Sequence, residues 1–262
     1  MKTKRITLLL TILMTGIITA RAQYSIVFIG NSITHGATLS SPALECPPVQ
    51  TVKLLQAKGH TVKFANCGYS GSTTVDFLPA SRNLFPKVLQ AADTLYDPNV
   101  WLIFSISLGT NDSAIEGPTG APVSPGDYSR NLQVIIDSLH NRYPHSIFVL
   151  HRPIWYSPNT YNRSKYLAAG LSRLQTYTPQ LDKLVKENPD YIFKGDRNAY
   201  DFFRKDPDKY FTAEKGNAGI FFLHPNALGA EKLGGFWANN LANTIEALYR
   251  NSVHKQVGHR AY

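Results

Sequence analysis

Four residues spread along the chain have the types that acyl transfer requires. That chemistry needs a hydroxyl nucleophile, a general base, and hydrogen-bond donors aimed at the oxyanion that forms during attack. Ser32 can supply the hydroxyl and its own backbone N–H, and His224 can supply the base. Gly71 can supply a second N–H with no side chain in the way, and the Asn111 carboxamide can supply a third donor. The sequence therefore predicts serine-dependent acyl transfer if the fold brings these residues together.

Three of these residues follow segments that have the composition of β-strands. Ser32 follows the apolar run 26–29, Gly71 follows 61–66, and Asn111 follows 100–106. Parallel strands all end at one edge of a sheet, which is where ligands bind in open α/β folds. We therefore expect the three turns to converge. For Gly30-Asn31-Ser32 alone, a plain turn with a helix cap remains an alternative.

The remaining segments alternate between strand and helix patterns. Near-continuously apolar strands between helices are typical of a parallel sheet that is covered on both faces. No repeat or linker interrupts residues 23–262, so we predict one domain. Further strands are expected at 146–150 and 191–193, helices at 48–58, 88–95, 128–142, 166–187 (broken near Pro179) and 226–249, and irregular structure at 195–219.

The first 22 residues have the pattern of a signal peptide. Lys2, Lys4 and Arg5 precede a largely apolar stretch at 6–20, and Ala20-Arg21-Ala22 fits a signal-peptidase site. We expect cleavage after Ala22 and export to the periplasm or the extracellular space. The stretch is short for a membrane span, and no cysteine stands at the cleavage point to carry a lipid. An uncleaved anchor is the alternative, but we expect no stable membrane anchor.

Charge and cysteine content narrow the classes of partner. The formal net charge of +9 becomes +5 once the four basic residues of the signal segment are removed, and the remaining basic residues form no block. We therefore expect no nucleic-acid partner. No cysteine or histidine cluster indicates a metal site, so neither metal nor cofactor is expected. Cys46 and Cys67 can form a disulfide in an oxidising compartment or stay as two free thiols.

Four short motifs resemble those of the SGNH (GDSL-type) hydrolases, in the family's order and across most of the chain. They are Gly30-Asn31-Ser32, Gly68-Tyr69-Ser70-Gly71, Gly109-Thr110-Asn111-Asp112 and His224-Pro225-Asn226. The resemblance implies a flavodoxin-like three-layer α/β/α sandwich with a parallel sheet of about five strands. It implies Ser32 as nucleophile, His224 as base, and Ser32, Gly71 and Asn111 as the oxyanion hole. It also implies ester hydrolysis through an acyl-enzyme without a metal.

Two residues depart from the family pattern. Asn31 replaces the usual Asp before the serine, at a position with no catalytic role. Phe221 stands three residues before His224, where the family usually has the Asp that orients the imidazole. We therefore expect a Ser–His dyad with a backbone carbonyl holding the imidazole N–H. An acid from elsewhere in the chain, for example Glu214 or Asp201, is the second choice.

Aromatic residues after the fourth strand point to the class of substrate. Trp155 and Tyr156 lie on a loop at the active edge and can stack on a sugar ring, although packing within the loop is an alternative. With export and no long apolar lid segment, this favours removal of O-acetyl or other short acyl groups from a small-molecule or glycan ester. The alternatives are a lipase, thioesterase or arylesterase with the same machinery, or a non-catalytic carbohydrate-binding protein on a decayed hydrolase fold.

Overall fold

The computed structural model describes residues 23–258, with side chains through residue 249. The signal-peptide prediction lies outside the described residues. Strands and helices alternate along most of the chain, as the sequence predicts. The elements are β1 (Gln23–Gly30), α1 (Ser32–His35), α2 (Pro42–Glu45), α3 (Pro47–Ala57), β2 (Thr61–Gly68), the 3₁₀ turns η1 (Val75–Phe77) and η2 (Pro79–Ser81), α4 (Phe85–Leu95), β3 (Trp101–Ser107), α5 (Pro125–Arg142), β4 (Ser146–Leu150), α6 (Leu167–Glu187), β5 (Ile192–Lys194), α7 (Ala199–Lys205), α8 (Pro207–Tyr210), β6 (Phe211–Gly216), β7 (Gly219–Pro225) and α9 (Ala227–Gly258).

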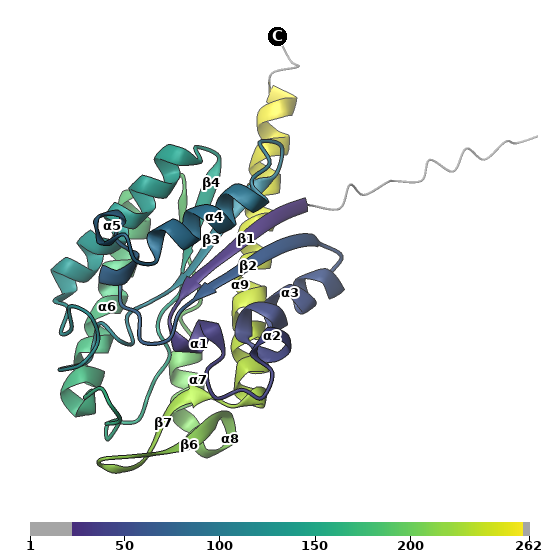
Figure 1. The fold of residues 1–262 in the computed structure, drawn as a ribbon. Helices are drawn as coiled ribbons and strands as arrows, with labels where there is room; N and C mark the ends of the chain where they lie inside the picture. The colour runs from purple at the N-terminus through teal and green to yellow at the C-terminus, as the bar shows by residue number, and fades with distance from the viewer. Residues whose placement is uncertain (1–22, 259–262) are drawn as a thin grey trace, which may run out of the picture.

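A five-stranded parallel sheet with the order β2-β1-β3-β4-β5 forms the centre of the molecule (Figure 1). Gly30, the last residue of β1, pairs with Gly68 on one side and Ser107 on the other. The carboxyl ends of the three strands are therefore level with one another. The turns that follow them start from the same edge of the sheet, as a shared site requires.

Helices cover both faces of this sheet, which confirms the predicted three-layer fold. Phe28 stacks on Trp237 of α9, at 6.1 Å between ring centroids. Phe104 contacts Tyr143, which ends α5, and it pairs with the residue before Phe28, so its side chain points to the opposite face. Helices α3 and α9 lie on one side of the sheet in Figure 1, and α4, α5 and α6 lie on the other.

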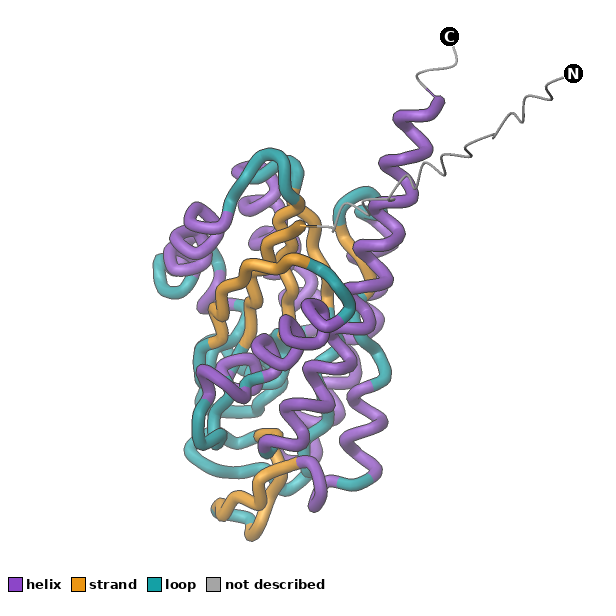
Figure 2. Tube along the Cα trace, turned by 90° about the vertical axis from the view of Figure 1, so that its right-hand side faces the viewer, coloured by secondary structure: helices purple, strands orange, loops and turns teal. Residues whose placement is uncertain are grey.

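A two-stranded antiparallel hairpin, β6–β7, lies beyond the carboxyl edge of the sheet (Figure 2). It corrects the prediction of irregular structure at 195–219, which in fact contains α7, α8 and β6. The turn of the hairpin is Asn217-Ala218, between the paired Gly216 and Gly219. After the buried Phe211, the strand β6 alternates between half-buried and exposed residues and carries few apolar ones, so its sequence gives only a weak strand signal.

Helix α6 runs without interruption through Pro179, where a break was expected. Proline removes one backbone hydrogen bond and crowds the preceding turn. Here that cost is offset by packing, because buried side chains continue on both sides of the proline, including Leu174, Tyr177, Leu181 and Leu184. The core contacts of the amphipathic face therefore outweigh the tendency of Pro179 to break the helix.

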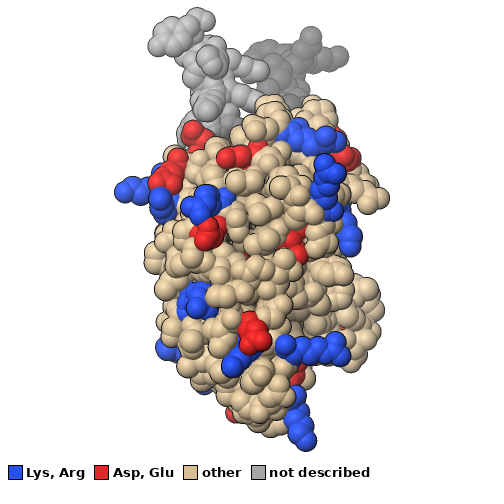
Figure 3. Space-filling view, turned by 60° about the vertical axis from the view of Figure 1, so that its left-hand side comes forward, with Lys and Arg blue, Asp and Glu red and all other residues tan. Residues whose placement is uncertain are grey.

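Charges are mixed on the surface shown in Figure 3, where Lys and Arg side chains alternate with Asp and Glu and form no continuous basic area. Within residues 23–258, the structure contains no helix that is both long and apolar enough to cross a membrane.

Candidate functional site

Ser32 lies immediately after the turn that ends β1, as the first residue of the short helix α1. The preceding Asn31 is the cap of this helix, since its Oδ1 accepts a hydrogen bond of 3.0 Å from the Ile33 N–H. The turn-and-cap alternative is thus correct for Asn31 and leaves the Ser32 side chain free for another role. As the first residue of a helix, Ser32 also has a backbone N–H with no partner inside the helix.

The Ser32 hydroxyl contacts the imidazole of His224, and the far side of that imidazole contacts a carboxylate. The distance from Ser32 Oγ to His224 Nε2 is 2.9 Å, and that from His224 Nδ1 to Glu214 Oε1 is 2.8 Å. The side chain of His224 is 10% exposed and that of Glu214 is 20% exposed, so both are mostly shielded from water. A serine, a histidine and a carboxylate are therefore aligned in a chain of hydrogen bonds.

Glu214 corrects the expectation that a backbone carbonyl holds the imidazole. It was the second choice from the sequence, and it lies on β6 directly opposite Phe221 of β7. Its Oε1 also lies 3.3 Å from the backbone N of His224, which donates to it. Asp201, the other acid named from the sequence, is half exposed and forms ion pairs with Arg152 and Arg204 instead.

The partners of His224 decide which of its two nitrogens carries the proton. An ionised carboxylate only accepts hydrogen bonds, so the proton of the neutral ring lies on Nδ1, facing Glu214. His224 Nε2 is then unprotonated and can accept the Ser32 hydroxyl proton. This is the tautomer that general-base catalysis requires.

Gly71 and Asn111 line the same cavity as Ser32 and His224. Gly71 adopts φ +83°, and a side chain there would meet no atom within 4 Å. Glycine is thus favoured at this position by its backbone conformation rather than by lack of space. Among the described residues no hydrogen bond uses the Gly71 N–H, which is available to a ligand.

The Asn111 carboxamide is fixed at both ends. Its Nδ2 donates to the Ser72 carbonyl at 2.8 Å, and its Oδ1 accepts from the Tyr166 hydroxyl at 2.6 Å. These bonds determine which end of the amide is the nitrogen and leave one Nδ2–H unused. Tyr166, which the sequence analysis did not single out, is buried and lines the same cavity.

The hairpin that carries Glu214 and His224 is attached to the loop that follows β4. Ser157 donates its N–H to the Phe222 carbonyl at 2.9 Å and accepts the Phe222 N–H on its Oγ at 2.8 Å. At the tip, Asn217 donates its N–H to the carbonyl of Tyr161 at 2.7 Å. Backbone bonds at both ends thus hold the base and its carboxylate in place.

Trp155 and Tyr156 lie behind the site rather than in it, which corrects their prediction as substrate-binding residues. Trp155 is 8% exposed and packs edge-on against Phe211 of β6, while Tyr156 is fully buried. The Tyr156 hydroxyl is 2.9 Å from Ser113 Oγ, and its ring packs against Tyr166. Trp155 packs against β6 and Tyr156 packs against Tyr166, and neither side chain lines the cavity.

The cavity has a volume of about 460 Å³, the size of a small-molecule site. Its wall also contains Ser70, Ser164 and the exposed Arg163. The two cysteines lie outside it, and both are free thiols. Burial raises the pKa of Cys67 to about 11, which keeps that thiol protonated. Within the described part of the chain, no three His, Cys, Asp or Glu side chains are arranged to hold a metal ion.

A second serine–histidine contact lies inside the core. Ser105 Oγ of β3 is 3.0 Å from His151 Nε2, and the His151 ring is stacked against Trp237 of α9. His151 Nδ1 accepts the backbone N–H of Asp196 at 3.0 Å, so in the neutral ring the proton lies on Nε2. The nitrogen that faces Ser105 therefore donates and cannot take the serine proton, the reverse of the arrangement at His224.

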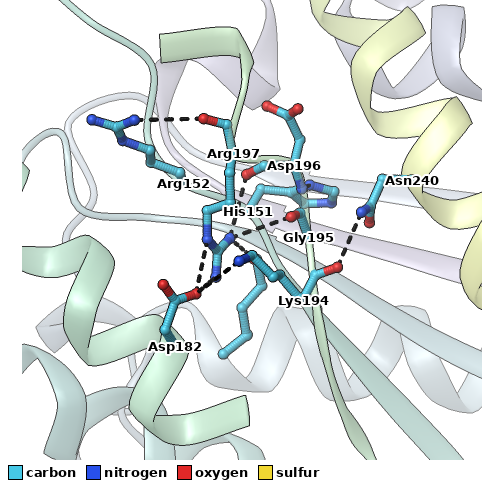
Figure 4. A network of polar contacts seen from close by, with 9 residues as sticks. His151, Arg152, Asp182, Lys194, Gly195, Asp196, Arg197 and Asn240 are labelled. Carbon is cyan, nitrogen blue, oxygen red and sulfur yellow. Dashed lines mark hydrogen bonds and ion pairs between the residues drawn. The ribbon is translucent and has the colours of Figure 1, made fainter. Parts of the chain in front are cut away.

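Burial and the neighbouring charges make the His151 contact structural. Ser105 and His151 are 2% and 1% exposed, and burial, with a smaller effect of Arg197, lowers the pKa of His151 to about 3. Around the ring, Arg197 bonds to the Leu150 carbonyl and to Asp182 (Figure 4). These contacts, with the ion pair from Lys194 to Asp182, join the ends of β4 and β5 to α6, and none of these residues lines the catalytic cavity.

The chain is similar in sequence to one family of ester hydrolases. The model of the GDSL-like Lipase/Acylhydrolase family matches residues 28–232, which include Ser32, Gly71, Asn111 and His224. No curated protein matches the chain.

Solved structures with the same fold come from several bacteria. A lipase/acylhydrolase from Enterococcus faecalis has a TM-score of 0.58 at 16% identity and aligns over 84% of this chain and 96% of its own. A catalytic mutant of the acetylxylan esterase Axe2 from Geobacillus stearothermophilus has a TM-score of 0.58 at 18% identity, over 86% and 95%. The esterase EstA from a Pseudoalteromonas species has 0.57 at 13%, over 85% and 98%.

Proposed function

Because the chain belongs to the GDSL-like lipase/acylhydrolase family of ester hydrolases, we propose that Ser32 is its nucleophile, with His224 as general base and Glu214 as the carboxylate that orients the base. The observation that carries this proposal is the hydrogen-bonded line from Ser32 Oγ through His224 to Glu214. Ser105 is not a rival nucleophile, because its histidine presents a protonated nitrogen to it.

In the first half of the reaction, Ser32 Oγ attacks the ester carbonyl as its proton passes to His224 Nε2. The imidazolium that forms is stabilised by Glu214 at the opposite nitrogen. The oxyanion accepts the N–H groups of Ser32 and Gly71 and the unused Nδ2–H of Asn111. Collapse of the tetrahedral intermediate breaks the ester C–O bond, and the alcohol leaves with the proton from His224.

In the second half, water hydrolyses the acyl-enzyme. His224 Nε2 takes a proton from the attacking water, and the same three donors hold the second oxyanion. Its collapse releases the carboxylic acid, and the proton on His224 returns to Ser32 Oγ. Every proton moves through His224 Nε2, the nitrogen that faces the serine, which acts first as a base and then as an acid in each half of the reaction.

For the substrate, we propose esters of short acyl groups, in particular O-acetyl groups on carbohydrate. The cavity is small and contains polar side chains, including Asn162, Arg163 and Ser164, next to Ser32. One protein with the same fold is an acetylxylan esterase, while others are named lipase/acylhydrolase and esterase. A lipase, thioesterase or arylesterase with the same residues is the alternative. Rising activity from acetyl to octanoyl esters would favour that alternative.

We also propose that the mature protein acts outside the cytoplasm, in the periplasm or beyond. The support is the pattern of the first 22 residues, with basic residues, an apolar stretch and a small-x-small site. N-terminal sequencing of the protein recovered from its native host tests this proposal, and we expect the chain to begin at Gln23.

Acetate release from p-nitrophenyl acetate and from acetylated glycans tests the catalytic assignment. Wild type should release acetate, and Ser32→Ala should lose the activity while its melting temperature is retained. A fluorophosphonate probe should label wild type, and mapping by mass spectrometry should find the adduct on Ser32. Equal acetate release by the variant would reject the nucleophile. Glycan binding without turnover in wild type would support the non-catalytic alternative.

A further inference from the structure

A second cavity of about 320 Å³ adjoins the catalytic one. The two share Ser70, Gly71 and Ser164 in their walls, so a ligand that leaves the catalytic cavity past Gly71 enters the second directly. We call this second space the adjoining cavity. The rim of the adjoining cavity includes Tyr69.

Tyr69 is one of the most exposed large apolar side chains among the described residues, at 51%. Its backbone is nevertheless firmly held, because its N–H donates to the Gly30 carbonyl at 3.0 Å and its own carbonyl accepts the Ser72 hydroxyl at 2.8 Å. The ammonium of Lys87 lies 4.8 Å from the ring centroid, a cation–π contact. Tyr69 thus presents a positioned aromatic ring to solvent beside the catalytic cavity.

Polar groups on the wall of the adjoining cavity are also positioned. The Asp76 carboxylate accepts the Thr73 N–H at 2.9 Å and the Asn83 side-chain amide at 3.0 Å. Asn83 itself is exposed, and within the described residues its side-chain amide forms no hydrogen bond other than that to Asp76. Positioned amide groups beside an aromatic ring suit a sugar, whose hydroxyls form hydrogen bonds and whose C–H face stacks on the ring. An acyl chain would leave these polar groups unsatisfied.

We propose that Tyr69 and Asn83, with Asp76 holding the amide of Asn83, form a sugar-binding subsite for the unit next to the acylated sugar. The inference rests on the proposed ester hydrolysis and narrows its substrate to oligosaccharide or polysaccharide esters. The ester-bearing unit occupies the catalytic cavity, and the chain continues past Gly71 to Tyr69.

The test compares two ratios of kcat/KM in wild type, Tyr69→Ala and Tyr96→Ala. The first ratio is kcat/KM for acetylated xylotriose or mannotriose divided by kcat/KM for p-nitrophenyl acetate. The second ratio is kcat/KM for p-nitrophenyl octanoate divided by kcat/KM for p-nitrophenyl acetate. Tyr96 is the matched control, because it is an exposed tyrosine that packs on Tyr143 away from the site. For at least one trisaccharide, Tyr69→Ala should lower the first ratio about tenfold relative to wild type. The Tyr96 variant should match wild type.

Equal trisaccharide ratios in wild type and Tyr69→Ala, for both sugars, overturn the subsite. A Tyr69→Ala effect confined to the octanoate ratio also overturns it, since Tyr69 would then contact an acyl chain. A Ser32→Ala background separates the subsite from the catalytic proposal. Calorimetric titration with unacetylated xylotriose and mannotriose should show binding there that weakens about tenfold in Ser32→Ala/Tyr69→Ala. If wild type hydrolyses no ester, the catalytic proposal fails while this binding result still decides the subsite.

Discussion

Removal of the Glu214 carboxylate is the sharpest test of how the base is held. Glu214 Oε1 accepts from two donors on one residue, the backbone N and the Nδ1 of His224. The carboxylate therefore fixes both the position and the tautomer of the ring. It also stabilises the positive charge that appears on the ring when the Ser32 proton arrives.

The geometry allows these two contributions to be separated. Glutamine at position 214 can still accept both N–H groups with its amide oxygen, so Glu214→Gln mainly removes charge. Opposite charges about 4 Å apart gain about 4 kcal/mol at an effective dielectric constant of 20. With Glu214 20% exposed, we expect about half of this, a roughly 30-fold loss in kcat/KM. Glu214→Ala also frees the tautomer, and we expect a loss of about 10³-fold, somewhat below the 10⁴-fold cost of a wrong tautomer in a serine protease.

Hydrolysis of p-nitrophenyl acetate measures both variants, with melting temperatures to confirm folding. Asp201→Ala is the matched control, because this acid forms surface ion pairs with Arg152 and Arg204 and should leave the rate unchanged. A Glu214→Ala enzyme within threefold of wild type would refute the carboxylate role and return the site to a Ser–His dyad. A glutamine variant slower than the alanine variant would contradict the double-acceptor geometry.

Three further predictions concern residues around the same site and the buried histidine. Tyr166→Phe removes the hydrogen bond that holds Asn111 Oδ1 and should lower kcat for p-nitrophenyl acetate about tenfold with little change in KM. The loss should be smaller than the roughly 10²–10³-fold fall in kcat that follows complete removal of an oxyanion donor. An equal rise in KM would indicate ground-state binding instead. Ser105→Ala should retain wild-type kcat/KM in the same assay, and a loss like that of Ser32→Ala would make the buried pair catalytic. The pKa of His151 is lowered to about 3 in the folded chain. Between about pH 6.5 and that value the unfolded chain binds this proton and the folded chain does not, so the free energy of unfolding falls as the pH falls. In urea unfolding, wild type should lose about 2 kcal/mol more between pH 6.5 and 5 than His151→Gln, and parallel curves would refute this.

The parts of the site that the sequence predicted are those that follow predicted strands. Ser32 and Asn111 follow the buried strands β1 and β3, and Gly71 follows the less buried edge strand β2. The level carboxyl ends of the three strands bring their turns together. β1 and β3 are recognisable because both faces of a parallel sheet are buried. The order of residues along the chain is therefore enough to place the turns at their ends on one edge of the sheet.

The aromatic residues show where this reasoning stops. Trp155 and Tyr156 were placed correctly on a loop beyond β4, but the direction in which a loop side chain points depends on what covers it. Here Phe211 of the hairpin covers Trp155, while Tyr156 packs against Tyr166. The exposed aromatic ring beside the catalytic cavity is instead Tyr69, within the second motif. Residue type and sequence position alone do not distinguish these two environments.

Glu214 was the hardest residue to identify, and its place follows from the register of the hairpin. A two-residue turn at Asn217-Ala218 pairs Gly216 with Gly219, and counting back two residues on one strand and forward two on the other pairs Glu214 with Phe221. Directly opposite residues of an antiparallel pair have Cβ atoms about 5 Å apart. A carboxylate on the neighbouring strand can therefore act on the same imidazole as an aspartate at position 221 would. The turn signal is weak because Asn-Ala lacks the glycine that favours such hairpins. Phe221 leaves the usual position without a carboxylate. The register that the turn sets places the carboxylate of Glu214 beside His224 from the opposite strand.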